Sequence, residues 1–305
     1  MSASIFSQLP APLTEALAAQ YNETDLARIA AGYAAVRRSA LRVNPARISR
    51  EDAARQLAAA GIESEPIAWY DDVLLLAANS ESALRETALY QNGDIYLQNP
   101  SSMLPPLLLG AQPKEDILDM CAAPGSKTTQ LHALCPSARI TACEKDKVRA
   151  ERLRYNLQKQ GAKNVNVMVA DATRLDSYLR FGRIMLDAPC SGSGTVLAAR
   201  PQSYKAYSAA LVKNSAALQS RLLKKALSLL PKGGEMVYST CSVHKAENEA
   251  VVLPFLKRGE AEVIPAPQPL CDALPLLPCE IEGALLVCPT EVHEVFFAVK
   301  LKKLK

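Results

Sequence analysis

The chain has 305 residues, of which 49% are hydrophobic and 22% are charged. This balance excludes collagen, low-complexity and wholly disordered proteins. The eight cysteines include no C-x-x-C pair, which argues against a zinc knuckle or a disulfide framework and favours a reducing compartment. The sequence has no basic leader and no run of about 18 apolar residues. We therefore expect a cytoplasmic protein that does not span a membrane.

Charge is distributed unevenly along the chain. Residues 1–110 contain eight Arg, no Lys and twelve acidic residues, whereas residues 111–305 contain 27 basic and 19 acidic side chains. Residues 145–163 hold seven basic side chains, and a second basic cluster comprises Arg37, Arg38, Arg42, Arg47 and Arg50. Such clusters suit a polyanion such as RNA, although charge alone favours a solvated surface. Arg42, between two apolar residues of an expected strand, is the arginine most expected to be structural.

Residues 1–100 predict a small α+β domain with helices ahead of its first strand. The expected elements are helices at 25–35 and 49–60 and strands at 40–43 and 69–77. Ser49, followed by Asp52 three residues later, resembles a capping box at the start of the second helix. The proline-rich segment 96–106 is expected to be a linker to a second domain, residues 101–305.

From residue 116 onward, apolar β-rich runs alternate with helical patterns. The expected strands are 116–121, 139–144, 165–171, 183–189 and 235–240, and the expected helices are 127–134, 145–161, 206–230 and 245–256. This alternation predicts an α/β domain in which a Rossmann-like parallel sheet has helices on both faces. In such sheets the ligand crevice lies at the carboxyl ends of the strands. Residues directly after each strand are therefore the candidates for a site.

The first of these strands runs into a loop of small residues, Asp119 to Thr128. Such a loop lets backbone amides approach a ligand and points the following helix N-terminus at it. It is not a Walker A loop, because Ser126 separates Gly125 from Lys127, and the dinucleotide motif G-x-G-x-x-G is absent. Nucleotide binding is the natural inference, and a loop without a ligand stays open as an alternative.

Three acids follow successive strands: Glu144, Asp171 and Asp187. An acid after the second strand can hold ribose hydroxyls, and an acid after the third can accept a bond from an adenine amino group. Each acid alone is a weak signal, because Asp often caps a helix or opens a loop. Together they favour a cofactor that contains adenosine and presents no pyrophosphate.

Two cysteines also occupy strand ends, Cys190 and Cys241. Each follows an apolar strand and precedes polar loop residues, where a thiol can face a ligand. The other thiols considered are expected to be small buried hydrophobes: Cys135, Cys143, Cys271, Cys279 and Cys288. His244, three residues after Cys241, makes a cysteine hydrolase an alternative, although that function leaves the acids and the small-residue loop unexplained.

Three segments together resemble the NOL1/NOP2/Sun family of RNA cytosine-C5 methyltransferases, which use S-adenosylmethionine. They are DMCAAPGSKT at 119–128, LDAPCSGSGT at 186–195 and YSTCSVHKAEN at 238–248. The looser matches RSALRVN and YLQNPSSMLP help to extend the resemblance over nearly the whole chain. The resemblance implies a class I methyltransferase domain over residues 101–305 and an RRM-like domain over residues 1–100.

The resemblance also implies roles for single residues. Glu144 would bind the ribose, where the family usually has Asp, and Asp171 would contact adenine. Asp187 and Cys190 match the family's Asp-Ala-Pro-Cys segment, with Asp187 also bordering the cofactor, and Cys241 matches its Thr-Cys-Ser nucleophile. The methionine end of the cofactor would be held by Cys121, Ala122, Ala123, Pro124, Gly125, Ser126 and Lys127.

This chemistry requires a nucleophile, because cytosine C5 does not accept a methyl group directly. A Cys241 thiolate would add to C6, and Asp187, protonated or sharing a proton at N3, would stabilise the adduct. Cys190 would assist release after methyl transfer. Lys127 would either contribute positive charge or serve structurally.

The expected partner is an RNA, ribosomal or transfer RNA, in which a paired target base would have to be flipped out. We expect a monomer that needs no metal ion. The chain ends soon after the methyltransferase pattern is complete, so no added C-terminal RNA-binding domain is expected. A non-catalytic RNA-binding factor built on the same fold is the other alternative.

Overall fold

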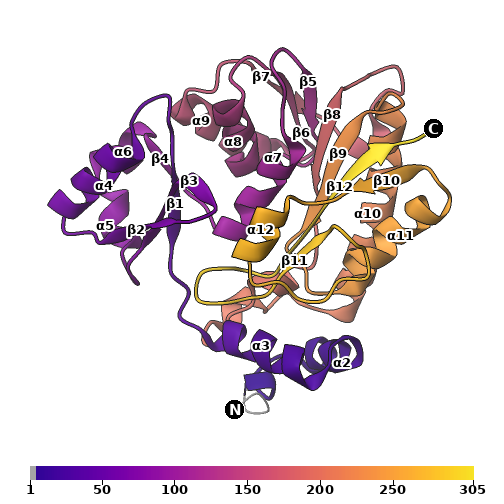
Figure 1. Ribbon diagram of the computed structural model, residues 1–305, viewed down its shortest axis with the longest axis horizontal. Helices are drawn as coiled ribbons and strands as arrows, with labels where there is room; N and C mark the ends of the chain where they lie inside the picture. Colours follow the sequence, from indigo (N-terminus) through magenta and orange to yellow (C-terminus); the bar gives the residue numbers. More distant parts are fainter. Residues whose placement is uncertain (1–4) are drawn as a thin grey trace.

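A computed structural model describes residues 5–305 and places them around two β-sheets (Figure 1). Residues 1–4, the start of the predicted N-terminal domain, lie outside the described residues. A four-stranded sheet belongs to the N-terminal part of the chain, and an eight-stranded sheet belongs to the remainder. No helix within residues 5–305 is long and apolar enough to cross a membrane.

Ahead of the first strand lie α2 (Ala11–Gln20) and α3 (Glu23–Ala34). Asn22 caps α3, because its side chain accepts a hydrogen bond from the backbone N–H of Asp25 at 2.9 Å. The sequence predicted a helix at 25–35 and missed α2, which begins in a proline-containing stretch. The buried residues of both helices join the core of the larger sheet rather than that of the smaller one.

The N-terminal sheet has the order β2-β3-β1-β4, and every neighbouring pair is antiparallel. Its elements are β1 (Ala40–Val43), α4 (Arg50–Ala59), β2 (Ser64–Ile67), β3 (Tyr70–Leu76), α5 (Glu81–Arg85), α6 (Ala88–Asn92) and β4 (Ile95–Leu97). This β-α-β-β-α-β succession is ferredoxin-like, the topology of RRM domains, and confirms the RRM-like prediction. Ser49 caps α4 as predicted, accepting a bond from the Asp52 N–H at 3.1 Å. The sequence did not predict β2 and β4.

The prediction that residues 96–106 form a linker is wrong. They begin in β4, continue through a short 3-10 helix, η1 (Pro100–Met103), and enter α7 (Leu104–Leu109). The prolines that suggested a linker stand in the first turns of η1 and α7, where no N–H is needed. Five of the six residues of α7 are buried, because the helix packs on the larger sheet.

The larger sheet has the order β10-β12-β9-β8-β5-β6-β7, with β11 paired to β12 off this path. Its strands are β5 (Asp116–Asp119), β6 (Arg139–Glu144), β7 (Val165–Val169), β8 (Arg183–Asp187), β9 (Glu235–Thr240), β10 (Ala261–Ile264), β11 (Leu285–Val287) and β12 (Phe296–Lys303). The α-helices between them are α8 (Ser126–Leu134), α9 (Lys147–Gln160), α10 (Ala209–Leu229), α11 (Glu249–Lys257) and α12 (Gln268–Ala273). Each strand and helix predicted between residues 116 and 257 is present.

The sheet is mixed rather than purely parallel. Strands β5 to β9 are parallel as predicted, whereas β12 runs antiparallel to both β9 and β10. We predicted no strand after residue 257, so this reversal was missed. Figure 1 shows α8 and α9 on one side of the sheet and α10 and α11 on the other. The Rossmann-like layering is therefore confirmed, with one antiparallel strand added.

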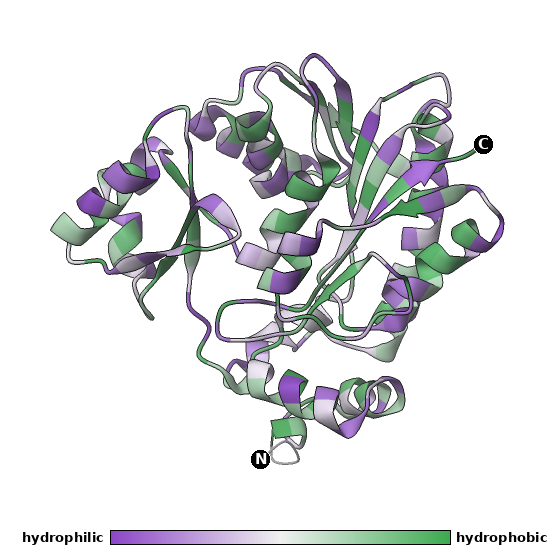
Figure 2. Cartoon of the chain, viewed as in Figure 1, coloured by the Kyte–Doolittle hydropathy of each residue, from purple (hydrophilic) through white to green (hydrophobic). Residues whose placement is uncertain are grey.

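Side chains along each strand alternate between the two covered faces. Leu118 and Leu186 pack with residues of α10, and their neighbours Ile117 and Met185 pack with residues of α7 and α8. Figure 2 shows hydrophobic residues along the strands and hydrophilic residues interspersed on the covering helices. Because both faces are covered, functional side chains gather at the carboxyl edge of the sheet.

Candidate active site

Two loops leave the carboxyl ends of β8 and β9, and each carries one of the predicted reactive cysteines. The two strands are parallel neighbours, so their loops begin at the same edge of the sheet. The sulfur atoms of Cys190 and Cys241 lie 3.2 Å apart, and both residues are partly exposed. The structure thus brings together two thiols that are far apart in the sequence.

The Cys190 loop lies directly on the backbone of the Cys241 loop. The N–H of Gly194 donates to the carbonyl of Cys241 at 2.9 Å, and the carbonyl of Gly194 accepts from the N–H of Val295 at 3.1 Å. A Cβ at position 194 would lie 2.8 Å from the Cys241 carbonyl oxygen and 2.5 Å from that of Val295. Only glycine permits this approach, which keeps the two loops in register.

A buried carboxylate also joins the two loops. Glu247, in η5 (Lys245–Glu247), has no exposed surface. Its Oε1 accepts from the Ser191 N–H at 2.8 Å, and its Oε2 accepts from the hydroxyls of Ser191 and Ser242 at 2.6 and 2.5 Å. Each serine directly follows one of the two cysteines. The sequence predicts a helix over residues 245–256 but does not indicate this role of Glu247.

Replacing Glu247 should destabilise the fold as well as loosen the two thiols. We expect Glu247→Ala to lower the free energy of unfolding by about 2–4 kcal/mol, because several buried donors lose their acceptor. Urea denaturation measures this change. The control is Glu262→Ala, which removes a half-exposed carboxylate paired with Lys302 and should cost about 0.5 kcal/mol or less. Equal urea midpoints for Glu247→Ala and Glu262→Ala would contradict the conclusion that Glu247 holds the two cysteine loops together.

Lys127 reaches the same centre from the first turn of α8. Its Nζ lies 2.8 Å from Oδ2 of Asp187 and donates to the Ser102 hydroxyl at 2.7 Å. The Ser239 hydroxyl donates to Oδ1 of Asp187 at 2.8 Å. Burial alone would lower the pKa of Lys127, but the Asp187 carboxylate raises it above its usual value. Asp187 is therefore one half of an ion pair, and Lys127 supplies the positive charge that was one of its two expected roles.

Asp119 is a further acid at this edge that we did not select. It ends β5 and is 1% exposed, and the Thr128 hydroxyl donates to its Oδ2 at 2.7 Å. Burial, opposed by this hydrogen bond, raises the pKa of Asp119 to about 7. The same strand-end rule that selected the other acids would have found it.

The Cys241 thiol is neutral at rest. The hydrogen bond with Cys190, burial, and the negative charges of Asp187 and Glu294 raise the pKa of Cys241 well above its ordinary value. A thiol in this state would have to give up its proton before its sulfur could act as a nucleophile. The charges of the nearby Lys127–Asp187 pair act on this thiol.

A second pocket adjoins this centre at the ends of β5, β6 and β7, and it has a volume of about 180 Å³. Two of the predicted cofactor acids, Glu144 and Asp171, line it together with Cys121 and Pro189. Oε1 of Glu144 accepts from a backbone N–H, and its Oε2 lies 3.4 Å from Arg149. The two bonds to Asp171 within residues 5–305 both go to Oδ1. Bonds from the Thr173 hydroxyl and amide, together with nearby positive charges, lower the pKa of Asp171 despite burial.

The rest of the small-residue loop lies outside this pocket. Ala122 and Ala123 are buried against Leu153 of α9. Gly125 stands at the N-cap of α8 with φ +106°, a conformation that favours glycine, while Pro124 is exposed and Ser126 is half-buried. Of the predicted loop residues, Cys121 lines the pocket and Lys127 pairs with Asp187. Contacts of the others with a cofactor stay predictions.

The geometry does not support a Cys241–His244 pair. The Nε2 of His244 lies 2.9 Å from the Tyr207 hydroxyl, and its Nδ1 lies 3.5 Å from the Gln20 amide. Burial lowers the pKa of His244 to about 4, so the ring is neutral. No cluster of three or more His, Cys, Asp or Glu side chains that could hold a metal ion is found within residues 5–305.

The five clustered arginines have different environments. Arg42 is 1% exposed and donates to Thr129 at 3.0 Å, which confirms its structural role. Arg37 is also largely buried and lies 3.4 Å from Glu294. The remaining three form ion pairs at the surface: Arg38, Arg47 and Arg50. The cluster is therefore not a continuous surface for phosphates.

Comparison with protein families identifies the chain. A family model described as 16S rRNA methyltransferase RsmB/F matches residues 106–302. The chain belongs to this family. A second model, described as the ferredoxin-like domain of RsmF/B-like methyltransferases, matches residues 9–81. Both matches agree with the resemblance that the sequence motifs indicated.

Curated members of the RsmB/F family extend this finding. Ribosomal RNA small subunit methyltransferase F of Aeromonas salmonicida is 37% identical over 278 residues, which cover 87% of this chain and 58% of that protein. The 26S rRNA (cytosine-C(5))-methyltransferase nsun-1 of Caenorhabditis elegans is 35% identical, covering 74% of this chain and 35% of that protein. The chain spans about half the length of the curated RsmF relatives that it matches.

Solved structures confirm the RsmB/F fold. A methyltransferase homologue from Pyrococcus horikoshii is 31% identical with a TM-score of 0.77, and the match covers 97% of this chain and all of that one. NSun6 from the same organism, solved with SFG, has a TM-score of 0.86 at 21% identity over 98% of this chain and 99% of that one, which shows the fold alone. The larger sheet is therefore a class I methyltransferase domain, preceded by a ferredoxin-like domain.

Proposed function

We propose that this chain methylates C5 of a cytosine in RNA and takes the methyl group from S-adenosylmethionine. The observation that carries the proposal is the contact between Cys190 and Cys241 beside the Lys127–Asp187 ion pair. Relatives named for small-subunit rRNA make ribosomal RNA the first substrate to test, and transfer RNA the second. A cytoplasmic location and a monomeric state stay predictions.

The pocket beside the thiols fits the proposed cofactor. Glu144 and Asp171 line it, and their carboxylate oxygens would accept hydrogen bonds from ribose hydroxyls and from an adenine amino group. Met120, Leu218 and Leu222 supply apolar surface for a ring. When bound, S-adenosylmethionine would supply an electrophilic methyl group.

The two thiols would act at opposite ends of the reaction. The Cys241 sulfur forms a bond to C6, and the displaced electrons move toward N3, which gains a proton. The proton lost by Cys241 balances this gain, and the Lys127–Asp187 pair would relay it. C5 becomes an enamine carbon and takes the methyl group. A base then removes the C5 proton, the C5=C6 bond re-forms and Cys241 leaves as a thiolate with the help of Cys190. The N3 proton returns to the thiolate through the Lys127–Asp187 pair, which restores the neutral product base and the Cys241 thiol.

The proposed function is tested with the purified chain, labelled S-adenosylmethionine and unmodified RNA. We expect label in small-subunit rRNA, and bisulfite sequencing should show 5-methylcytosine at a defined position. Methylation of transfer RNA alone would change the substrate and keep the chemistry. Cofactor binding without transfer to either RNA would instead support the non-catalytic factor, and thiol-sensitive hydrolysis without cofactor affinity would support the hydrolase.

Asp171→Ala should weaken S-adenosylmethionine binding by about 1–3 kcal/mol, because a charged hydrogen-bond acceptor of the pocket is lost. Isothermal titration calorimetry measures this change. Asp176→Ala is a matched control, because Asp176 also accepts a backbone bond in a turn, from Tyr178 at 2.8 Å, but does not line the pocket. Unchanged affinity in Asp171→Ala would remove this residue from the cofactor site.

A further inference from the structure

A basic pocket of about 580 Å³ lies between the ferredoxin-like domain and the loop that follows Cys190. Its lining includes four arginines from three parts of the chain: Arg37 and Arg38 after α3, Arg85 at the end of α5, and Arg200 after the Cys190 loop. None of the reaction steps proposed above uses this pocket.

The pocket carries an excess of positive charge. The lining has two carboxylates, Glu81 and Glu294, against the four guanidinium groups, and a third carboxylate, Glu65, pairs with Arg38 from outside the lining. Glu81 pairs with Arg85, and Glu294 pairs with Arg37. Among the described residues that line the pocket none is aromatic, so it offers no surface on which a base could stack. A single anionic group is the ligand that suits this lining.

Arg37 provides the sharper observation. Its side chain is only 8% exposed, and none of its three guanidinium nitrogens has a hydrogen-bond partner within residues 5–305. Buried polar groups are normally hydrogen-bonded, because an unsatisfied donor is costly. The Glu294 contact, at 3.4 Å, supplies charge but leaves the N–H donors open. The pocket therefore lacks an acceptor that Arg37 is placed to bind.

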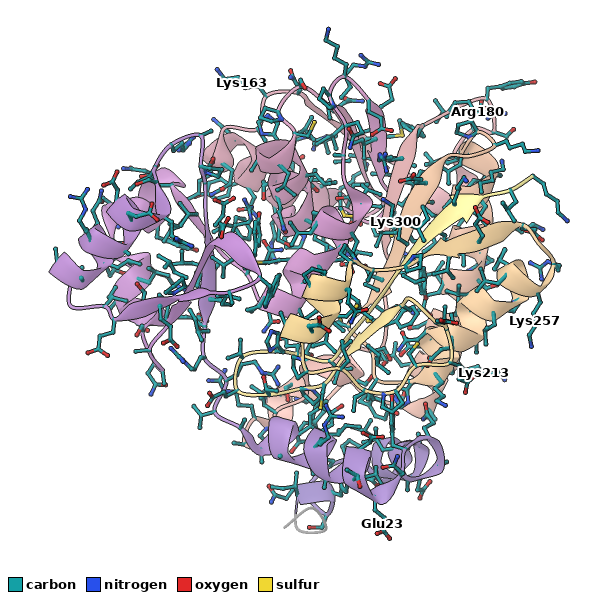
Figure 3. The ribbon with its side chains drawn as sticks, in the orientation of Figure 1. Glu23, Lys163, Arg180, Lys213, Lys257 and Lys300 are labelled. Carbon is teal, nitrogen blue, oxygen red and sulfur yellow. The ribbon has the colours of Figure 1, made fainter. Side chains whose placement is uncertain are left out.

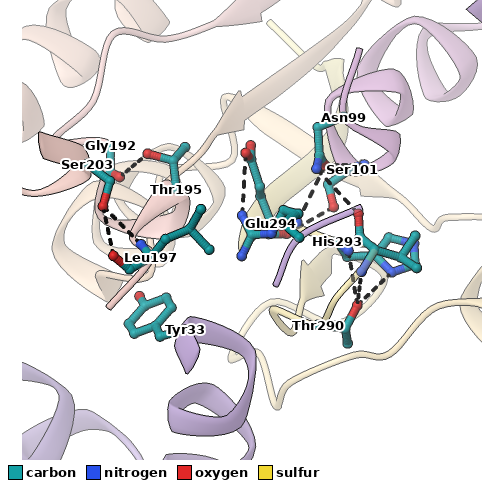
Figure 4. Close-up of polar contacts among 12 residues, drawn as sticks. Tyr33, Asn99, Ser101, Gly192, Thr195, Leu197, Ser203, Thr290, His293 and Glu294 are labelled. Carbon is teal, nitrogen blue, oxygen red and sulfur yellow. Dashed lines mark hydrogen bonds and ion pairs between the residues drawn. The ribbon is translucent and has the colours of Figure 1, made fainter. Parts of the chain in front are cut away.

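The pocket is connected to the two thiols through short contacts. Figure 4 shows Glu294 between Asn99 and Ser101 on one side and the Leu197–Ser203 turn on the other. Ser101 donates to the Glu294 carbonyl at 2.9 Å, and the next residue, Ser102, binds Lys127. The charge of Glu294 also acts on Cys241. A ligand in this pocket would therefore be linked to the catalytic centre through Glu294 and the Ser101–Ser102 segment.

We propose that this pocket binds a phosphodiester group of the RNA strand that carries the target cytosine, held between Arg37 and Arg200. The proposal rests on the RNA methyltransferase function argued above. A guanidinium group presents paired donors that match the oxygens of a phosphate. Arg200 is exposed and belongs to the chain after the Cys190 loop, and its guanidinium group forms no hydrogen bond or ion pair within residues 5–305. Binding there would anchor the strand while its neighbouring base enters the catalytic centre.

The test uses Arg200→Gln in the full chain, with a fluorescently labelled, unmodified fragment of small-subunit rRNA. We expect the KM for RNA to rise about tenfold with little change in kcat. The slope of log affinity against log salt should become shallower by about 0.7, the value for one lost phosphate contact with a single strand. Affinity for S-adenosylmethionine should not change.

Arg180→Gln is the matched control, because Arg180 lies in the loop before β8, whereas Arg200 lies in the chain after it. Figure 3 shows Arg180 at the periphery of the molecule. A second variant, Arg37→Lys, keeps the buried charge beside Glu294 and removes the paired donors. Arg37→Lys alone should raise the KM for RNA. When it is combined with Arg200→Gln, the slope of log affinity against log salt should stay as shallow as in Arg200→Gln.

The outcomes separate this proposal from the function on which it rests. RNA binding is measured without turnover, so a wild-type chain that binds RNA but transfers no methyl group would contradict only the proposed function. Wild-type methylation combined with an unchanged KM and salt slope in Arg200→Gln would overturn the phosphate site. An equal loss in Arg180→Gln would also overturn it, because the effect would then be one of general charge.

Discussion

The Cys241→Ala variant will form neither 5-methylcytosine nor a covalent complex with RNA. Removing the nucleophile should lower the rate of methyl transfer by about 10⁴-fold or more. Cofactor affinity should persist, because Cys241 is not among the residues that line the proposed cofactor pocket. Cys271→Ala, which removes a partly exposed thiol in α12, is the control and should retain activity.

Cys190→Ala should behave differently, although its sulfur lies only 3.2 Å from that of Cys241. Attack remains possible in this variant, whereas release is slowed. An enzyme–RNA adduct should therefore accumulate, survive denaturing electrophoresis and disappear in the double variant. An adduct in Cys241→Ala that is absent from Cys190→Ala would reverse the two roles. Retained methylation without an adduct in any variant would contradict the covalent mechanism.

Asp187→Ala should lower the single-turnover rate by about 10²–10⁴-fold, the usual contribution of a positioned acid–base group. The loss has two physical causes. The proton relay to N3 is removed, and the Lys127 ammonium loses the carboxylate that lies 2.8 Å from it. Rapid-quench measurements at saturating cofactor and RNA would report the chemical step directly.

The control for this prediction is Asp116→Ala. Asp116 also lies on a strand of the larger sheet and also forms an ion pair, with Arg139, but it stands at the opposite end of β5 and is half-exposed. Its removal should leave the rate within about twofold of wild type, because surface ion pairs contribute little. A rate for Asp187→Ala close to that of the control would exclude Asp187 from proton transfer.

The alternation of strands and helices between residues 116 and 257 was predictable because each element carries a long periodic pattern. The sequence also indicated which strand ends hold acids and cysteines. The linker prediction for residues 96–106 was wrong for a local reason, because prolines that begin a helix look the same in the sequence as prolines in a linker. The antiparallel β12 depends on pairing with β9 and β10, and local sequence does not encode such pairing.

The sequence indicated candidate residues for the site, but it did not indicate how they lie relative to one another. The contact between Cys190 and Cys241 arises from the parallel pairing of β8 with β9 and from the close approach at Gly194. Glu247 was overlooked because it falls within a helical pattern, where an acid normally signals a solvated face. The ion pair of Asp187 could not be anticipated, because Lys127 comes from a different strand–helix connection.

Helices α2 and α3 precede the ferredoxin-like sheet in the sequence, but they pack with the methyltransferase domain. Their fully buried side chains, among them Leu13, Leu17 and Ile29, belong to the core of the methyltransferase sheet. The hydroxyl of Tyr21 donates to the Val243 carbonyl at 2.7 Å, which ties α2 to the Cys241 loop.

The Tyr33 hydroxyl likewise donates to the Ser193 carbonyl at 2.8 Å, which ties α3 to the Cys190 loop. The ferredoxin-like elements, residues 40–97, are thus an insertion in the sequence of the methyltransferase domain, between α3 and α7. If the chain were cut at residue 100, the C-terminal fragment would lose the helices that contact both cysteine loops. The N-terminal fragment would expose the apolar faces of α2 and α3 to water.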